Sequence, residues 1–224
     1  MLLLAVDTSG KNGSLALARV TARESKVDVL EIVPLAGGAF SAELIPQIAE
    51  SLSRRGYRNS DLEVFAVASG PGSFTGLRVG LAAIKALADA LQKPIAAVSL
   101  LEAVASLGQT RNQVMAALDA GRGDIYLGEY ELATHPRMLS ERLLTREESV
   151  EVANGKTVAT PDAALAEFFR SAGIECEKVS SPDSATIANL GWQHILRGDT
   201  VGPDELEANY IRRTDAEIFA QSKR

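Results

Sequence analysis

The chain has 224 residues, a formal net charge of −6 and 46% hydrophobic residues, enough to bury the core of one large domain or of two lobes. No run of 18 apolar residues occurs, so no membrane span is expected. The apolar start lacks the basic flank of a signal peptide, and the single Cys176 excludes an internal disulfide, so a cytoplasmic location is expected. A pI near 5.1 predicts poor stand-alone binding to nucleic acid.

The first part of the chain predicts a three-stranded meander followed by a helix. The expected strands are residues 2–6, 14–20 and 26–33. Residues 7–13, rich in turn-forming side chains, join the first two strands. A helix is then expected over residues 41–54, with Ser41 as its N-cap. Pro46 is compatible with this helix only if it lies in the first turn.

The chain is organised around Ser69-Gly-Pro-Gly-Ser-Phe-Thr-Gly76, which follows a predicted strand at residues 64–68. Ser73 is a good N-cap for a helix over residues 74–91, which is rich in alanine and leucine. Such a helix is apolar over most of its circumference, so it must be buried on more than one side. Gly76, Gly80 and Ala83 give that helix small residues where a second helix could approach, so the second contact is either the core of the same chain or another protein.

The remaining elements alternate between strands and helices. They are strands at residues 94–99, 114–118, 125–132, 138–144, 157–160 and 175–179, helices at 100–107, 162–172 and 185–196, and an irregular stretch at 150–155. A meander followed by alternating strands and helices, twice over, predicts an α/β protein of two lobes. The expected lobes are residues 1–100, which carry the dimerisation helices, and residues 101–224, whose last segment is free to pack back on the first lobe.

Two aspartates suggest an internal duplication and a nucleotide site. Asp7 and Asp119 each follow a buried strand and precede a glycine-bearing turn. With Thr8 and Ser9 beside the first of them, they could hold Mg²⁺ water and phosphate oxygens. The alternative, that each aspartate caps its own turn, is favoured by roughly two to one from the turn preference of Asp.

Other catalytic chemistry is poorly supported by the sequence. The glycine loop lacks the Gly-Lys-Ser/Thr ending of a phosphate loop, and the stretch 157–162 has no glycine turn for an adenosine. His135 and His194 lie far apart, and neither has a second ligand four residues on. Cys176 has no activating histidine nearby. No cofactor, metal site or catalytic residue is therefore expected, and a metallopeptidase is the weakest interpretation.

The motifs together resemble the bacterial TsaB (YeaZ) family, which is similar to TsaD and is also called glycoprotease-like. The resemblance rests on Leu4-Ala-Val-Asp-Thr-Ser9, Ser69-Gly-Pro-Gly-Ser-Phe-Thr-Gly-Leu-Arg-Val-Gly80, Ala97-Val-Ser-Leu-Leu-Glu-Ala103, Leu118-Asp-Ala120 before Asp124-Ile-Tyr-Leu-Gly128, and Asn209-Tyr-Ile-Arg212. It covers nearly the whole chain. It implies a two-lobed ASKHA fold (the actin, sugar-kinase and Hsp70-like architecture), in which each lobe is a mixed sheet with flanking helices.

The resemblance also implies a function. That function is a non-catalytic scaffold that pairs with TsaD, joined by TsaE, for threonylcarbamoyl transfer to adenosine 37 of tRNAs reading codons that start with A. At the positions of the metal-binding histidines of TsaD, this chain has Ser41 and Ser99, which are weak ligands. Contact with tRNA is then only indirect, and a homodimer is expected when TsaD is absent. The alternative is a nucleotide-dependent enzyme, such as a small kinase or ATPase, that acts through Asp7 and Asp119.

The partner interface is expected on the two helices of the first lobe. Its predicted residues are Leu44, Ile48, Leu52, Phe74, Gly76, Leu77, Gly80, Leu81, Ala83, Ile84 and Leu87. On this view, Gly80→Arg abolishes pairing with TsaD while leaving the fold largely intact.

Overall fold

The computed structural model describes residues 1–22, 24–110, 113–132 and 136–211. The chain forms two compact units. The first unit contains Met1–Ala103 and Ser180–Ala208, and the second contains Val104–Val179 and the described residues from Asn209 onward. A single division at residue 100 therefore does not describe the chain, because a long segment after the second unit returns to the first.

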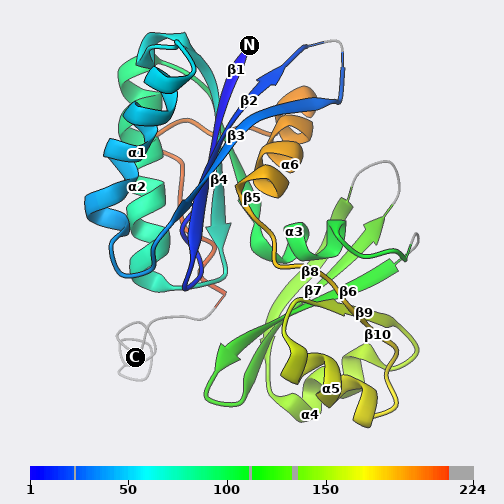
Figure 1. Ribbon diagram of the computed structural model, residues 1–224. Helices are drawn as coiled ribbons and strands as arrows, with labels where there is room; N and C mark the ends of the chain where they lie inside the picture. Colours follow the sequence, from blue (N-terminus) through cyan, green and yellow to red (C-terminus); the bar gives the residue numbers. More distant parts are fainter. Residues whose placement is uncertain (23, 111–112, 133–135, 212–224) are drawn as a thin grey trace, which may run out of the picture. The chain divides into compact units, whose positions relative to one another are not determined.

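The first unit is built on a five-stranded mixed sheet in the order β3-β2-β1-β4-β5 (Figure 1). Its strands are β1 (Leu2–Asp7), β2 (Gly13–Val20), β3 (Val27–Leu35), β4 (Leu62–Gly70) and β5 (Ile95–Ser99). The first three form the predicted antiparallel meander, while β4 and β5 run parallel to β1. The fourth strand leads directly into the glycine loop.

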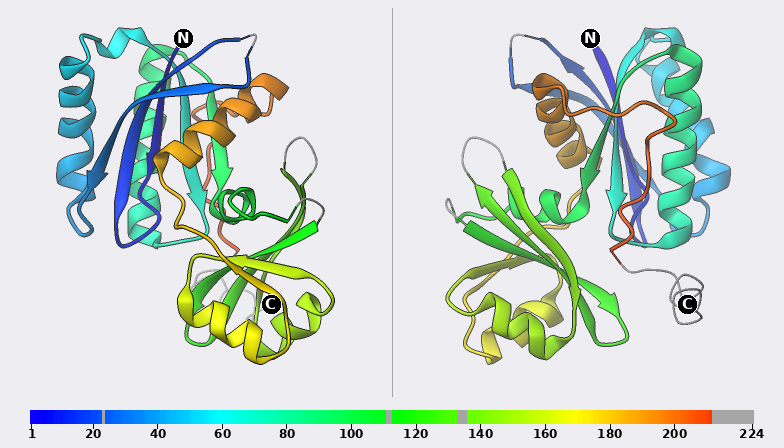
Figure 2. Two further views of the ribbon diagram at one scale, coloured as in Figure 1. Left: turned by 45° about the vertical axis from the view of Figure 1, so that its right-hand side comes forward. Right: turned by 180° about the vertical axis from the view of Figure 1, so that it is seen from behind.

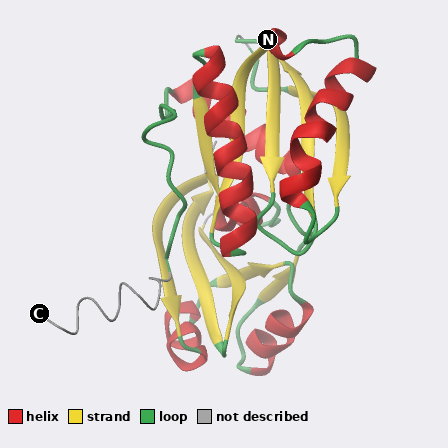
Figure 3. Cartoon of the chain, turned by 90° about the vertical axis from the view of Figure 1, so that its left-hand side faces the viewer, coloured by secondary structure: helices red, strands yellow, loops and turns green. Residues whose placement is uncertain are grey.

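Helices cover both faces of this sheet. They are α1 (Phe40–Arg54), α2 (Phe74–Leu91) and α6 (Ser184–Arg197). The short helix α3 (Leu100–Ser106) follows β5 directly, and a 3₁₀ turn spans Asn59–Asp61. Figure 3 shows α1 and α2 side by side over one face, and α6 lies on the other (Figure 1). Alternate residues of β1, such as Leu2, Leu4 and Val6, enter the core beneath α1 and α2.

The returning segment is seated closely on the first sheet. A Cβ added at Gly191 of α6 would overlap the Cβ of Ala66 on β4, so only glycine permits this approach. Farther along, Val201 forms an antiparallel bridge with Ile95 of the edge strand β5. The segment then crosses to the side of α1 and α2 (Figure 2), where Leu206 is buried in the core.

The second unit repeats the topology of the first. Its strands are β6 (Gln113–Gly121), β7 (Asp124–Leu132), β8 (Pro136–Leu144), β9 (Thr157–Thr160) and β10 (Cys176–Lys178). Their order, β10-β9-β6-β7-β8, matches that of the first sheet when the strands of each sheet are numbered from its own start. The helices α4 (Arg146–Ala153) and α5 (Ala163–Ser171) share one apolar cluster with β6, β7 and β9.

The predicted helices agree with the structure in part. The helix α2 has the predicted bounds, and the hydroxyl of Ser73 accepts from the Gly76 amide at 3.3 Å. The prediction of Ser41 as an N-cap is wrong, because Phe40 is buried as the first helical residue and Ala39 precedes it without a side-chain cap. Pro46 lies inside α1, beyond the first turn.

The prediction of an irregular stretch at residues 150–155 is also wrong in its first part, because α4 continues to Ala153. Its first turn is closed by a reciprocal capping box. The Thr145 hydroxyl accepts from the Glu148 amide at 3.2 Å, and the Glu148 carboxylate accepts from the Thr145 amide at 2.9 Å.

Candidate functional site

Most of the residues predicted to meet a partner belong to the core of the first unit. Leu44, Ile48, Leu52, Leu77, Leu81 and Ile84 are between 0 and 6% exposed. The apolar faces of α1 and α2 are directed at the first sheet and at each other. These six side chains are therefore unable to contact a second protein without unfolding the unit, and their assignment to the interface is corrected.

The two glycines of α2 also face inward. A Cβ added at Gly80 would overlap the hydroxyl of Thr8, and one at Gly76 would overlap the Thr8 carbonyl oxygen. The Thr8 hydroxyl donates to the Gly76 carbonyl at 2.8 Å. The glycines thus allow α2 to start against the end of β1, and they leave no opening for a partner helix.

The surface that α1 and α2 present to solvent mixes apolar residues with exposed charged ones, such as Glu50, Arg54, Arg78 and Asp89. We call its apolar part the outer face. It comprises Ala42, Ile45, Ala49, Phe74, Ala82 and Ala86. Ile45 is 51% exposed and Phe74 is 42% exposed. Of the predicted interface residues, Phe74 belongs to this face, while Ala83 and Leu87 are half-buried at its border. The spacing of the alanines on α2 was a readable signal, because they recur every four residues.

An aromatic side chain marks the start of α2 on this face. The guanidinium of Arg78 lies 3.7 Å from the centroid of the Phe74 ring, within the range of a cation–π contact. Phe74 therefore holds its ring in a defined orientation at the surface. Exposed aromatic and arginine side chains of this kind are enriched among the residues that dominate binding energies.

The turn after β1 closes on itself and on the glycine loop. A single carboxylate oxygen of Asp7 accepts from the Ser9 amide at 2.8 Å and from the Ser9 hydroxyl at 2.6 Å. The Ser9 carbonyl in turn accepts from the Ser73 amide at 2.7 Å. Burial raises the pKa of Asp7 above its usual value, the hydrogen bonds from Ser9 oppose this rise, and the charge of Asp183 adds to it.

Asp119 has a simpler environment in the second unit. Its carboxylate is exposed and accepts from the Gly121 amide at 3.0 Å. Each aspartate therefore caps its own turn, as the alternative interpretation of the sequence held. A role for Asp7, Thr8, Ser9 and Asp119 in holding Mg²⁺ or a nucleotide stays a prediction.

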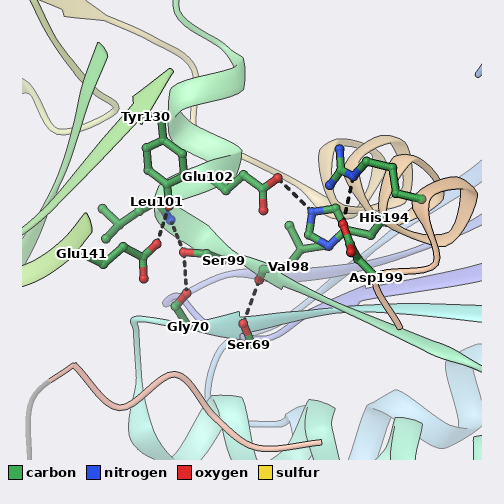
Figure 4. A network of polar contacts seen from close by, with 11 residues as sticks. Ser69, Gly70, Val98, Ser99, Leu101, Glu102, Tyr130, Glu141, His194 and Asp199 are labelled. Carbon is green, nitrogen blue, oxygen red and sulfur yellow. Dashed lines mark hydrogen bonds and ion pairs between the residues drawn. The ribbon is translucent and has the colours of Figure 1, made fainter. Parts of the chain in front are cut away.

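The residues considered as metal ligands are engaged elsewhere or lie apart. His194 contacts Glu102 on α3, with 2.9 Å between the ring Nε2 and the carboxylate Oε1 (Figure 4). The Ser99 hydroxyl accepts from the Leu101 amide and donates to the Gly70 carbonyl, whereas Ser41 is exposed. His135 lies outside the described residues. Within those residues, no three histidine, cysteine, aspartate or glutamate side chains gather as a metal site would require.

Three further sequence expectations can be compared with the structure. Cys176 lies on β10 with a free thiol, whose pKa is raised by burial. Over the ranges that the structure covers, no helix combines the length and the apolar character that crossing a bilayer requires. Of the C-terminal motif, Asn209 donates its side-chain amide to Glu141 of β8, and Arg212 lies outside the described part of the chain.

Comparison with known proteins gives consistent matches. The family model described as "TsaD: tRNA N6-adenosine threonylcarbamoyltransferase" matches residues 32–183, more than half of the chain. The "tRNA threonylcarbamoyladenosine biosynthesis protein TsaB" of Haemophilus influenzae is 28% identical over 227 residues, covering 94% of this chain and 93% of that protein. The structure of YeaZ from Pseudomonas aeruginosa matches with a TM-score of 0.73 and 27% identity, covering 93% of this chain and all of that one.

A more distant likeness concerns the fold alone. A ROK family protein from Streptococcus pneumoniae matches with a TM-score of 0.50 and 10% identity, over 89% of this chain and 99% of that one. The expected ASKHA architecture, with two mixed five-stranded sheets and flanking helices, is confirmed. The chain belongs to the family described as TsaD, tRNA N6-adenosine threonylcarbamoyltransferase, and groups there with the TsaB (YeaZ) proteins.

Proposed function

We propose that this chain is a non-catalytic scaffold subunit that pairs with TsaD, with TsaE joining the pair. The complex transfers a threonylcarbamoyl group to adenosine 37 of tRNAs that read codons starting with A. The names of the relatives support a role in threonylcarbamoyladenosine synthesis. The acidic character of the chain supports an indirect contact with tRNA, made through the complex.

The observation that carries the pairing is the outer face of α1 and α2. Two long helices lie side by side and expose Ile45, Phe74 and several alanines, with charged side chains such as Arg78 beside them. Small residues let a second pair of helices approach closely, and Ile45 and Phe74 supply the larger side chains that fill holes in a partner. The interface we propose is therefore the outer face, in place of the core leucines and glycines expected from the sequence.

The chemistry of the side chains supports the scaffold role. Ser41 and Ser99 stand where the family resemblance places histidines, and a hydroxyl is a weak ligand beside an imidazole. The Ser99 hydroxyl already makes two backbone hydrogen bonds, to the Gly70 carbonyl in the glycine loop and from the Leu101 amide in α3. The buried carboxylate of Asp7 already accepts two hydrogen bonds from Ser9 on one oxygen. The catalytic residues are thus expected on TsaD.

Co-purification with the TsaD of the same organism tests the pairing. Ala82→Arg places a long cation on the outer face, so we expect the amount of TsaD recovered to fall at least tenfold. Ala164→Arg makes the same change at an exposed position of α5 in the second unit, and it should leave recovery unchanged. Normal recovery with Ala82→Arg, in a variant that melts like the wild type, would contradict the assigned interface.

Two further measurements separate the scaffold from the enzyme. The purified chain alone should not modify tRNA, and addition of TsaD and TsaE should restore modification. Calorimetry with ATP and Mg²⁺ addresses the alternative kinase or ATPase. Micromolar binding that is lost in Asp7→Ala, with normal folding, would favour that alternative over the scaffold.

A further inference from the structure

A buried polar contact between α3 and α6 has no part in the proposed pairing. The Oε1 atom of Glu102 lies 2.9 Å from Nε2 of His194, and the two side chains are only 9% and 14% exposed. A carboxylate can only accept, so the ring Nε2 is the donor. Figure 4 shows both side chains pointing toward one another from the two helices. We call this pair the α3–α6 clamp.

The first half of the clamp lies at a boundary in the chain. The first unit ends at Ala103 and the second begins at Val104, so the boundary falls inside the seven-residue helix α3. Glu102 is the last residue but one before it. The start of α3 is also fixed to the first unit, because the Ser99 hydroxyl joins the Gly70 carbonyl to the Leu101 amide. The helix is therefore anchored at its first turn.

The second half of the clamp is on a rigid element. Along α6, the Ser184 amide donates to the Ser14 hydroxyl at 2.9 Å, and the Trp192 indole donates to the Glu24 carbonyl at 2.8 Å. Between them, Gly191 sits directly on Ala66 of β4. His194 follows one turn later, so its ring is a fixed point on the first unit to which Glu102 is held.

The chain passes from the first unit to the second through α3 and returns just before α6. The clamp thus joins the outgoing and the returning segment. We propose that the α3–α6 clamp holds the first turn of α3 on the first unit, so that bending of the chain between the units is confined to residues after Glu102. A hydrogen bond in a site with little access to water is costly to leave unmade, which suits it to this task.

Hydrogen exchange of the full-length chain tests the clamp directly. In Glu102→Ala and in His194→Ala, the amides of residues 104–108 should exchange at least tenfold faster, because the Leu107 and Gly108 amides bond only to carbonyls of α3. The amides of β1 and β4 should keep their protection. The matched control is Arg197→Ala, which removes an exposed 2.9 Å pair with Asp199 on the end of α6 and should change nothing.

A conservative variant separates the clamp from simple packing. In Glu102→Gln the side-chain oxygen still accepts from His194, so exchange of residues 104–108 should stay within threefold of the wild type. Unchanged exchange in both alanine variants would overturn the proposal. Equal acceleration throughout β1 and β4 would overturn it as well, because the pair would then support the sheet and not the position of α3.

A second readout measures the link between the units. Spin labels at Arg58→Cys and Ser171→Cys, both exposed, are introduced in a Cys176→Ser background. Adding Glu102→Ala should broaden the distribution of distances between the labels, while Arg197→Ala should leave its width unchanged. An equally narrow distribution with Glu102→Ala would contradict a role in limiting the bend.

Discussion

The two helix pairs of this molecule occupy equivalent places in two sheets of the same strand order, yet only the first pair exposes large hydrophobic side chains. The helices α1 and α4 each follow the third strand of a sheet, and α2 and α5 each follow the fourth. The first pair exposes Ile45 and Phe74, several alanines and charged side chains such as Glu50, Arg54 and Arg78. The second exposes Arg146, Glu147, Glu148 and Glu151 on α4, with Ala163, Ala164, Glu167 and Arg170 on α5, but no large hydrophobic side chain.

The comparison distinguishes the residues that the fold needs, which face the sheet, from the exposed residues that a partner could contact. Both pairs bury an apolar stripe against their own sheet, as any helix of this architecture must. Only the first pair also exposes large hydrophobic side chains, Ile45 and Phe74. A duplicated topology thus gives two helix pairs of similar arrangement, and their exposed residues distinguish the pair that we propose as the interface.

We expect the largest effect from a substitution that disrupts the close packing of α2 against Thr8 at the end of β1. Gly80→Arg forces a long cation against Thr8 and the end of β1, where even a Cβ would overlap. We expect a loss of roughly 4 kcal/mol or more in the free energy of unfolding. Urea denaturation followed by circular dichroism measures this loss. A native-like midpoint would show that α2 can move away from β1 and would favour placing this glycine at the interface after all.

The sequence could predict where α2 lies but not which way its small residues face. A helical pattern of Leu77, Leu81 and Ile84 identifies an apolar stripe, and that stripe was correctly expected to be buried. Glycine and alanine are small enough to be tolerated on either side of a helix, so the pattern alone does not show which way Gly80 and Ala82 face. Here Thr8, more than 70 residues away in sequence, decides that Gly80 is internal.

The second prediction compares the two aspartates at the strand ends. The pKa of Asp7 in the folded chain is raised above its ordinary value of 3.8 by burial. Below 3.8 the carboxyl is protonated in both the folded and unfolded states. Because the folded state prefers the protonated Asp7, it is stabilised relative to the unfolded state at low pH. As the pH rises through the folded pKa, the folded state must bury a charge, and this stabilisation is lost.

Asp7→Asn removes that charge while its side-chain oxygen can still accept from Ser9. The variant should be more stable than the wild type at pH 7, and the difference should shrink as the pH falls toward 4. Urea titrations at several pH values measure it. Asp119→Asn, at an exposed site, should stay within about 0.5 kcal/mol of the wild type at pH 7. If Asp7→Asn proved less stable than the wild type at pH 7, the ionised form would be the one that the fold needs.

The third prediction concerns how the first helix of each pair begins. Thr145→Ala removes half of the capping box of α4 and should lower the free energy of unfolding by about 1 kcal/mol. Ser41→Ala, in α1, is the matched control, because that hydroxyl makes no cap and its loss should be nearly neutral. Chemical denaturation measures the free energy of unfolding of both variants. Equal losses of stability would contradict the assignment of a cap to Thr145 and none to Ser41.

That capping box was also the missed signal for α4. Thr145 and Glu148 have the spacing of a helix start, but the residues after them are mostly charged and gave little apolar periodicity. The helix is held by its cap and by two small buried residues, Ser149 and Ala153. Patterning alone does not find such a helix, whereas the long apolar helix α2 was predicted to the residue.

We expect the smallest effect from a substitution at Gln92, the residue that ends α2. Gln92 has a left-handed backbone (φ 53°), whereas α6 ends on Gly198 in the same region. Gln92→Gly should therefore stabilise the chain by a few tenths of a kcal/mol, since glycine avoids the Cβ clash but loses the Gln92 hydrogen bond to the Asp89 carbonyl. Thermal melting measures the gain. Gly198→Ala should have the opposite sign, and a gain there would contradict the argument.

The return of residues 180–208 to the first unit has a consequence for synthesis of the chain. The first sheet emerges from the ribosome early, but its α6 face and the edge at Ile95 wait for partners that follow roughly 100 residues later. At about 5–20 residues per second, that wait lasts roughly 5–20 s. During this interval an apolar sheet face and the outer edge of β5 are exposed to solvent. The second unit can complete its fold first. Until residues 180–208 arrive, the exposed sheet face and strand edge of the first unit are the surfaces that chaperones would need to cover.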